Sequence, residues 1–223
     1  MAIADKPAHG KPGPKPTESV RRKVLEVALR IFADAGYDGA SVREIARQSG
    51  VNHAMIKYYF DTKEALWREA VTFLFDRANA ALEKNIDLKK AARGTEAALK
   101  EIVHSLVIYS ARHPEHGRLI MRESIGAGPR LEWLSKKSEG HHDALWQLLS
   151  HAGCEIGRYD PRFIALTYAL NSVCQTPFVL SREAQTIYGI ELTHKSFRSG
   201  YEELVLDLVP ALSRFLIHQT SRQ

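Results

Sequence analysis

The stretch SVREIARQSGVNHAMIKYYF, residues 41 to 60, decides the fold of the N-terminal part of this chain. Ser41 followed three residues later by Glu44 is the signature of a capping box, which predicts a short helix from Val42 to about Gly50. A second short helix is expected at about residues 53–59, after a tight turn. Two short helices joined by a glycine-containing turn form a helix-turn-helix unit, whose second helix can enter the major groove of DNA.

The sequence meets the packing demands of such a unit. Ala46 is small enough for the two helices to cross closely, and Gly50 tolerates the positive φ of the turn. Val51 and Ile56 supply apolar anchors from the second helix. The outward face of that helix then carries polar and aromatic side chains, which is unusual for a helix that needs only to be soluble: His53, Lys57, Tyr58 and Tyr59. We expect these side chains to face DNA, with core packing as the alternative for the two tyrosines and as the expectation for Phe60.

Helical patterns flank this unit on both sides. After Pro16, apolar residues recur three and four positions apart, which predicts a helix with Thr17 as its N-cap and Gly36 at its end. On the other side, Asp61 and Glu64 predict a second capping box and a fourth helix of about five turns.

The rest of the chain continues with helical periodicity and without sustained strand alternation. Helices are expected at about residues 95–112 and 131–152, with another from Pro114, and Asp160 followed by Pro161 marks a helix start. Two further long helices are expected at about 161–180 and 201–218, where Pro177 and Pro210 should kink or truncate them, whereas residues 181–200 show no clear period. The predicted class is all-α: an N-terminal three-helix helix-turn-helix domain and a larger helical domain.

Composition narrows the class of protein. The chain has 223 residues, 44% of them hydrophobic, which is enough to bury a core. We find no run of eighteen apolar residues and no apolar N-terminal segment, so we expect a cytoplasmic protein that does not interact with a membrane. Cys154 and Cys174 are too few and too far apart to predict a disulfide framework. The formal net charge of +5 favours an anionic partner, and residues 1–16 read as a flexible basic arm or a merely solubilising tail.

The N-terminal region resembles a known family. In order, VLEVALRIFADAGYDGA and SVREIARQSGVNHAMIKYYFDTKEAL, residues 24 to 66, resemble the DNA-binding segment of the TetR family of transcriptional regulators, over about residues 20–70. The resemblance implies a homodimer whose subunits bind an operator through residues 17–62. Residues 63–223 would then bind a small-molecule effector and the partner subunit.

Site residues follow from the resemblance position by position. It implies base or near-base contacts for Arg43, His53, Met55 and Lys57, and phosphate contacts for Tyr58, Tyr59 and Lys63. Ser41 belongs to the same DNA-binding group. Family members commonly have a small hydroxyl residue in place of Met55 and a tyrosine in place of Lys57, so we expect an operator sequence particular to this protein.

In the larger domain, aromatic and long apolar side chains suggest a ligand pocket, although core packing is the alternative for each of them. The candidates are Tyr109, Met121, Trp133 and Tyr168. The last two long helices are expected to form a four-helix interface with the partner subunit. We expect this interface to bury Leu166, Leu170, Val173, Leu204, Leu208 and Leu212.

Two other classes of site are weighed and disfavoured. The chain contains no G-x-S-x-G, H-E-x-x-H or phosphate-binding glycine loop, so we expect no enzyme and no cofactor. The histidines do not form a dense cluster with cysteine, so we expect no metal site. Packaging of nucleic acid without sequence preference is a further alternative, against which the modest charge and the well-formed second helix both count.

Overall fold

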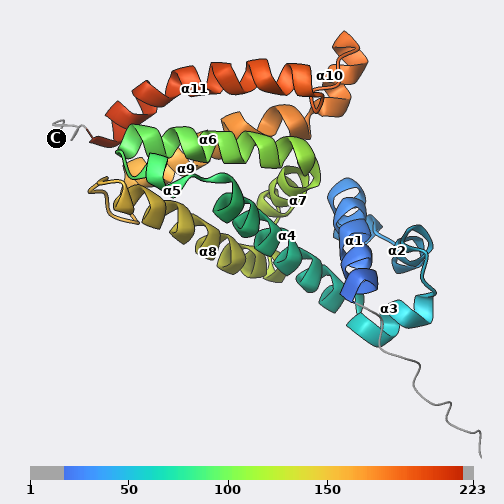
Figure 1. Cartoon of the computed structure of the whole chain (residues 1–223). Coiled ribbons are helices and arrows are strands. Elements are labelled where there is room, and N and C mark those ends of the chain that lie inside the picture. The colour runs from blue at the N-terminus through green and yellow to red at the C-terminus, as the bar shows by residue number, and fades with distance from the viewer. Residues whose placement is uncertain (1–17, 218–223) are drawn as a thin grey trace, which may run out of the picture.

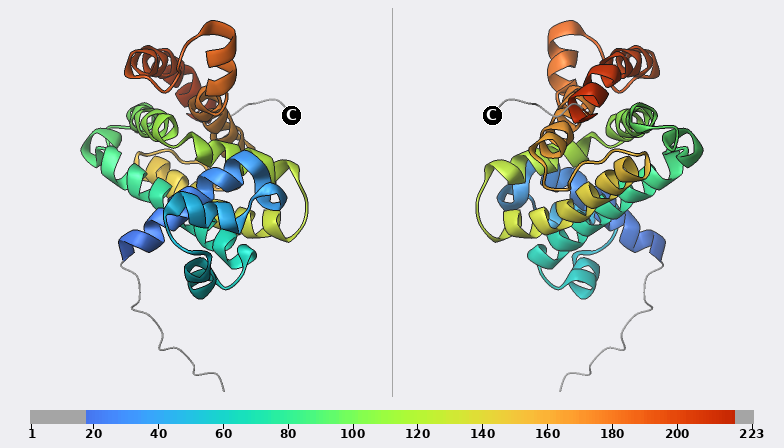
Figure 2. Two further views of the ribbon diagram at one scale, coloured as in Figure 1. Left: turned by 90° about the vertical axis from the view of Figure 1, so that its right-hand side faces the viewer. Right: turned by 90° about the vertical axis from the view of Figure 1, so that its left-hand side faces the viewer.

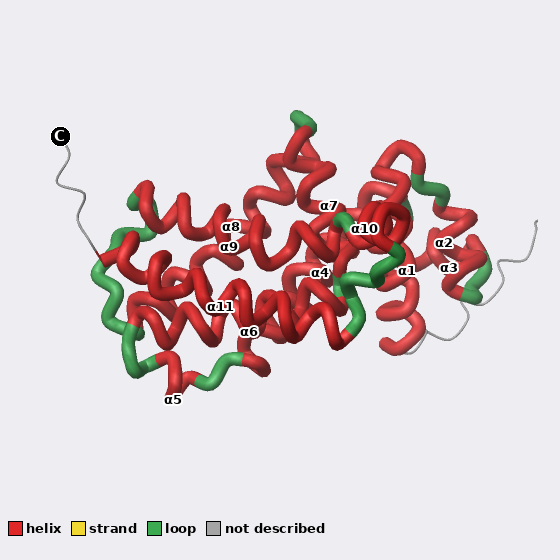
Figure 3. Tube along the Cα trace, turned by 90° about the horizontal axis from the view of Figure 1, so that it is seen from above, coloured by secondary structure: helices red, strands yellow, loops and turns green. Residues whose placement is uncertain are grey.

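A computed structural model describes residues 18–217, and all elements in that range are helices (Figure 1). The trace in Figure 3 consists of helices and loops only, so the all-α class is confirmed over these residues. The expected basic arm (residues 1–16), the expected N-cap Thr17 and His218 lie outside the described residues.

Eleven helices follow one another along residues 18–217. They are α1 (Glu18–Gly39), α2 (Val42–Ser49), α3 (His53–Phe60), α4 (Lys63–Asn85), α5 (Leu88–Ala91), α6 (Thr95–Arg112), α7 (Pro114–Ile125), α8 (Pro129–His151), α9 (Pro161–Val179), α10 (Ser181–Tyr188) and α11 (Lys195–Ile217). The starts predicted at Val42, Pro114 and Pro161 are confirmed, as is the helix predicted at residues 95–112.

The first three helices, here called the head, gather at one end of the molecule, and α4 runs from them into the body formed by the remaining helices (Figure 1). Two views at right angles to the first show α10 projecting from the body (Figure 2). The head is joined to the body mainly by α1, which packs against both α4 and α7. Helix α7 therefore connects the two parts.

Helix α1 is interrupted where the sequence predicted its end. Gly36 has φ 74° and ψ 172°, so the regular helix stops there and a further turn carries the chain to Gly39. A residue with a side chain is strained at such a φ, which explains the glycine.

The predicted cap of α4 is wrong by one residue. Thr62, and not Asp61, is the N-cap, and its Oγ1 accepts a hydrogen bond of 3.0 Å from the backbone N–H of Ala65. Asp61 instead ends α3 with a φ of 56°. The tight turn between α3 and α4 therefore uses Asp61 for its conformation and Thr62 for the cap.

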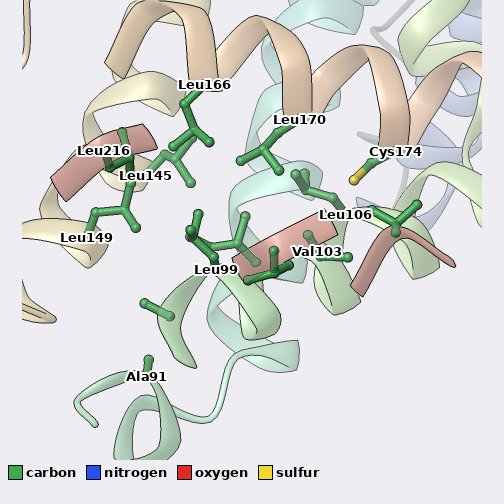
Figure 4. Close-up of a cluster of buried hydrophobic side chains, with 14 of the residues drawn as sticks. Ala91, Leu99, Val103, Leu106, Leu145, Leu149, Leu166, Leu170, Cys174 and Leu216 are labelled. Atoms are coloured by element: carbon green, nitrogen blue, oxygen red, sulfur yellow. The ribbon is translucent and has the colours of Figure 1, made fainter. Parts of the chain in front are cut away.

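Two clusters of buried apolar side chains hold the fold together. The cluster in the head joins α1, α2 and α3 to α4, and it also includes Leu119 from α7 and Leu134 from α8. The head core therefore continues into the body, and the domain division predicted between residues 62 and 63 stays a prediction. The second cluster lies between α6, α8, α9 and α11 (Figure 4).

Part of the predicted dimer interface is wrong. Leu166 and Leu170 point from α9 into the core of their own chain, and each is 1% exposed (Figure 4). Both side chains are already removed from water within one subunit, so they contribute no area to an interface with another. Leu204 and Leu208 on α11 are exposed, whereas Val173 and Leu212 are half-buried against the core.

Residues 181–200, which showed no period, contain α10 and the first turns of α11. Helix α10 is short and buries only Ala184, and its other apolar residues, Ile187 and Tyr188, are exposed. Pro177 and Pro210 both lie inside helices; α9 ends two residues after Pro177, whereas α11 continues beyond Pro210 to Ile217.

Between residues 18 and 217, no single helix is both long and apolar enough to cross a membrane. The bent pair α9 and α10 passes that test of length and composition only when both helices are taken together.

Candidate functional site

The first helix of the helix-turn-helix unit is capped as predicted, but in one direction only. Ser41 Oγ accepts a hydrogen bond of 3.4 Å from the backbone N–H of Glu44. The carboxylate of Glu44 accepts hydrogen bonds from Arg47 at 2.6 Å and from Gln48 at 2.7 Å. These bonds, that from Arg47 first, lower the pKa of Glu44 to about 2. The one acidic side chain of α2 is therefore already paired with a cation of the same helix.

The turn between the two helices depends on Gly50. Its φ is 69° and its ψ is 27°, the left-handed conformation expected from the sequence. Its backbone N–H bonds back to Arg47 at 3.2 Å, and the N–H of Val51 bonds to Ala46 at 3.1 Å. This Schellman-like pairing satisfies the last carbonyl groups of α2 and turns the chain sharply into α3.

Helix α3 is capped at its N-terminus and anchored by its buried face. Asn52 Oδ1 accepts a hydrogen bond of 2.7 Å from the backbone N–H of Met55, so Asn52 is the N-cap. This cap was not predicted from the sequence, although asparagine directly before a helix is a favoured residue there. Ile56 and Phe60, each 2% exposed, anchor the other face in the head core, as predicted for Phe60. The orientation of α3 is thereby set by its buried face.

The opposite face of the unit is free. Arg43, His53 and Lys57 are exposed, and none of their three side chains has a hydrogen-bond or ion-pair partner within residues 18–217. Tyr58 is 59% exposed and meets Tyr59 edge-on, with 5.3 Å between the ring centroids.

The remaining predicted contact residues are less open. Tyr59 is half-buried and packs against Phe60, and Met55 is also half-buried. Ser41 is exposed, but its hydroxyl takes part in the cap of α2. Most of the predicted residues on α2 and α3 are therefore open to solvent, whereas Met55 and Tyr59 are half-buried.

Lys63, at the start of α4, contacts the ring of Tyr37, which is not among the predicted contact residues. Its Nζ lies 4.7 Å from the ring centroid of Tyr37 and donates a hydrogen bond of 3.3 Å to the backbone oxygen of Asp38. The ring of Tyr37 is itself stacked on Phe32, with 6.1 Å between centroids. The tyrosine thus places a cation beside the free N–H groups of the first turn of α4, a location that favours phosphate.

Comparison with known proteins agrees with this geometry. Residues 24–70 match the family described as bacterial regulatory proteins, tetR family. This segment, residues 24–70, therefore belongs to the tetR family.

Two curated relatives match the N-terminal half. The probable HTH-type transcriptional regulator YttP of Bacillus subtilis is 32% identical over 108 residues, which are 47% of this chain and 50% of the relative. The HTH-type transcriptional repressor NicS of Pseudomonas putida is 29% identical over 111 residues, 50% of this chain and 51% of the relative. The chain thus spans about half the length of the curated relatives it matches.

Solved structures extend the likeness to the body. A TetR-like transcriptional regulator from Rhodococcus sp. RHA1 has a TM-score of 0.65 and 16% identity, over 92% of this chain and 100% of that one. HlyIIR, a hemolysin II transcriptional regulator, has a TM-score of 0.55 and 24% identity, over 91% of this chain and 99% of its own. At these identities the likeness establishes the fold alone, so the body shares the helical arrangement of these two structures.

In the body, a partly open cavity of about 240 Å³ lies between α4, α6, α7, α8 and α9. Three of the four residues predicted for an effector pocket, Tyr109, Met121 and Tyr168, line it. Trp133 does not. Its ring lies at the head side of the body, covered by Arg68 at 4.9 Å and Lys137 at 5.4 Å. Periodicity places an aromatic residue on a helix face but cannot tell which neighbour that face meets.

Histidine side chains, for which a surface position was expected rather than a metal site, line the same cavity, and His116 is buried. His116 Nδ1 lies 2.9 Å from the hydroxyl of Tyr109, and His141 Nδ1 lies 2.7 Å from Asn79 Oδ1. Burial lowers the pKa of His116 to about 3 and that of His141 to about 4, so both rings are neutral at neutral pH. Within residues 18–217, no group of three or more metal-ligating side chains is placed to hold an ion, and both cysteines are free and buried.

A buried ion pair lies behind the cavity wall. Arg77 Nη2 and Glu115 Oε1 are 2.7 Å apart, with side chains 16% and 10% exposed. Burial alone would raise the pKa of Glu115, but the hydrogen bond from His113 and the charge of Arg77 outweigh burial and hold it at about 2. The two charges compensate each other and leave no net charge beside the cavity.

A second, wider cavity of about 510 Å³ adjoins the first between α7, α8 and α9. The two share several lining residues, among them Ser138, His142 and Tyr168. The charged groups of the second cavity are Arg158 and Glu139, which pair with each other at 3.0 Å.

Helix α7 separates the cavity from the head. Gly117, Ile120 and Met121 line the cavity, whereas Arg118 and Arg122 reach the end of α1. Arg122 Nη2 donates a hydrogen bond of 3.1 Å to the backbone oxygen of Asp34, beside the break at Gly36. A ligand that shifted α7 would therefore move groups that bond directly to α1, the first helix of the head.

Proposed function

We propose that the protein is a sequence-specific transcriptional regulator, acting as a repressor, that binds a palindromic operator as a homodimer and responds to a small-molecule effector. The observation that carries the proposal is the outward face of α2 and α3. On a tetR-family domain, it presents Arg43, His53 and Lys57 without any partner within residues 18–217. Unpaired donors on a helix of this geometry suit the edges of bases in a major groove.

The residues divide by the chemistry that each can perform. Arg43 can read guanine with two hydrogen bonds, Lys57 can do so or meet a phosphate, and Met55 can touch a thymine methyl group. Tyr58, Tyr59 and Lys63 lie toward the end of α3 and the start of α4. We assign these three to phosphates, which fix the register of the protein on DNA without reading its sequence. Ser41 acts through the cap of α2, and its exposed position also allows a phosphate contact.

The dimer is proposed to form through α9 and α11. Leu204, Leu208 and Phe215 recur on α11 at helical spacing, and each is more than 40% exposed. Contiguous apolar side chains on a helix pair mark an association surface, and tetR-family membership supports a dimer. Two recognition helices about 34 Å apart would then enter successive major grooves.

The proposed response to an effector uses α7. A ligand that binds better when the heads are wrongly spaced releases DNA, and it does so only by its differential affinity for the two states. By thermodynamic linkage, operator DNA must lower the affinity for the effector by the same factor by which the effector lowers the affinity for operator DNA. As a regulator of this kind, the protein is proposed to act in the cytoplasm and to catalyse no reaction.

Selection of randomised duplexes by the purified protein tests the proposal, at about physiological salt and with excess non-specific competitor, because salt sets the non-specific background. We expect enrichment of a palindrome whose half-sites are about one helical turn apart. Bound DNA without a shared sequence would instead support sequence-independent packaging, and the absence of bound DNA would refute the proposal.

A further inference from the structure

The first cavity is lined without a single formally charged side chain. Its lining contains no Asp, Glu, Lys or Arg. Its three histidines, His116, His141 and His142, all have pKa values lowered, by burial first, so they add no positive charge at neutral pH. The strong charges that act on these rings are already paired, Arg77 with Glu115 at 2.7 Å, and Arg158 with Asp143 and, at 3.0 Å, with Glu139. A charged ligand would therefore give up its hydration without finding an opposite charge, which is costly in a buried site.

The two deepest imidazoles offer complementary hydrogen-bonding groups. Asn79 Oδ1 is an acceptor, so His141 donates through Nδ1, and its neutral ring keeps Nε2 as an acceptor. The hydroxyl of Tyr109 lies closer to His116 Nδ1, at 2.9 Å, than to the backbone oxygen of Leu74, at 3.4 Å. When the hydroxyl donates the shorter bond, the proton of His116 lies on Nε2, which becomes a donor. Within residues 18–217, neither Nε2 atom has a partner.

An apolar surface lies beside these groups. Phe75, on α4, packs against both imidazoles, with 5.6 Å between its ring centroid and that of His116 and 6.2 Å to that of His141. Leu106 and Ile120 also line this part of the cavity. A ligand there meets a ring and aliphatic groups on one side, and one neutral donor and one neutral acceptor on the other.

We propose that this cavity binds a neutral, ring-bearing molecule through a carboxamide or a hydroxyl group, and that it discriminates against carboxylates and against organic cations. A carboxamide carries both a donor and an acceptor, so it can bond to an Nε2 that accepts and to an Nε2 that donates. A carboxylate lacks the donor, an amidinium lacks the acceptor, and each brings a charge. The inference rests on the proposed function only for the role of this ligand as the effector.

Three probes of one shape test the inference: benzamide, benzoate and benzamidinium. Saturation-transfer NMR titrations of the full chain at neutral pH give a Kd for each, which for ligands of this size is on the order of 1 mM. We expect benzamide to bind at least about ten-fold more tightly than either ion, a difference of about 1.4 kcal/mol. Benzoate or benzamidinium binding as tightly as benzamide would overturn the proposal, and so would the absence of saturable benzamide binding.

A matched pair of variants locates the binding. Met121→Trp places a large side chain at the cavity mouth, where Met121 is 38% exposed, and should abolish benzamide binding. Ile125→Trp is the control on the same helix, because Ile125 is 89% exposed and does not line the cavity. Equal benzamide affinity in the two variants would show that the probe binds elsewhere and would also overturn the proposal.

None of these titrations contains DNA, so the outcome is independent of the duplex selection. Benzamide binding together with a failed duplex selection would refute the proposed regulator but leave the proposed ligand site standing. A successful duplex selection without benzamide binding would support the proposed regulator and refute the proposed class of ligand.

Discussion

Asp34 at the end of α1 and Arg182 on α10 are 148 residues apart in the sequence, yet the Asp34 carboxylate and the Arg182 guanidinium lie 2.8 Å apart. The other oxygen of the same carboxylate lies 3.2 Å from Arg118 Nε, on α7. One carboxylate of the head is therefore held by two helices of the body, and α7 is also the wall of the cavity. This arrangement makes Asp34 a positioning residue between the cavity and the DNA-binding face.

Replacing Asp34 with Asn should loosen the head. Arg118 is only 20% exposed and would lose its ion pair, so we expect a loss of about 1 kcal/mol in the free energy of unfolding, measured by urea denaturation. Asp38→Asn is the matched control, because Asp38 is 91% exposed and lies 3.9 Å from Arg130. Equal effects of the two substitutions would show that the Asp34 contacts do not hold the head.

Gly50→Val should damage the helix-turn-helix unit. Valine is strained at a φ of 69°, and we expect a loss of about 1 to 3 kcal/mol in the free energy of unfolding together with weaker operator binding. Gly140→Ala, in the middle of α8, where an added methyl group meets nothing within 4 Å, should instead leave the protein as stable or up to about 1 kcal/mol more stable. A Gly50→Val protein with unchanged unfolding and operator binding would place the critical turn elsewhere.

Lys63→Ala and Lys57→Ala should weaken DNA binding in different ways. If Lys63 meets a phosphate, its loss lowers the affinity for operator and random duplex alike and reduces the salt slope by about 1. Loss of a base contact at Lys57 should instead change which operator variants bind, at a cost of about 1 to 3 kcal/mol. Lys89→Ala, in the distant helix α5, is the control. A loss at Lys63 confined to the operator would show that it reads sequence.

Leu208→Glu should separate the proposed dimer into monomers. Leu208 is 44% exposed on α11, so the substitution leaves the subunit core intact and places a charge where the partner would pack. Sedimentation of this variant should show the mass of one subunit, whereas Leu88→Glu, at a 68% exposed site on α5, should remain a dimer. A dimer that survives the Leu208 substitution would place the interface on another surface.

Local sequence signals predicted the head well and the body less completely. Ser41, Gly50 and Pro161 act through the backbone of their own turn, so their roles are legible in the sequence. Leu166 and Trp133 were misplaced for the opposite reason: a periodic apolar position is known to be covered, but the covering partner is decided by how distant helices pack. Helix α10 was missed because it buries almost nothing. The cavity histidines depend on the same long-range packing, which brings α4, α7 and α8 together around Phe75.

Stability should fall as the pH drops below 6.5, because of the cavity histidines. The folded pKa values of His116 and His141, about 3 and about 4, lie below the ordinary value of 6.5. Between these limits the unfolded chain binds more protons than the folded one, so the free energy of unfolding decreases as the pH is lowered. At about pH 5 the loss is on the order of 2 kcal/mol for each histidine. Glu115, with its pKa of about 2, adds to the loss only below its ordinary value of 4.5.

The window between pH 6.5 and about 5 therefore isolates the histidines, and urea denaturation across it measures their contribution. His141→Gln cannot be protonated there, so its stability should depend less steeply on pH than that of the unchanged protein. His151→Gln is the control, since His151 is exposed at the end of α8 and should keep the full dependence. If His141→Gln and the unchanged protein lost stability in parallel, His141 would be protonated at an ordinary pH in the folded state. The neutral acceptor that it offers to a ligand would then be absent at mildly acidic pH.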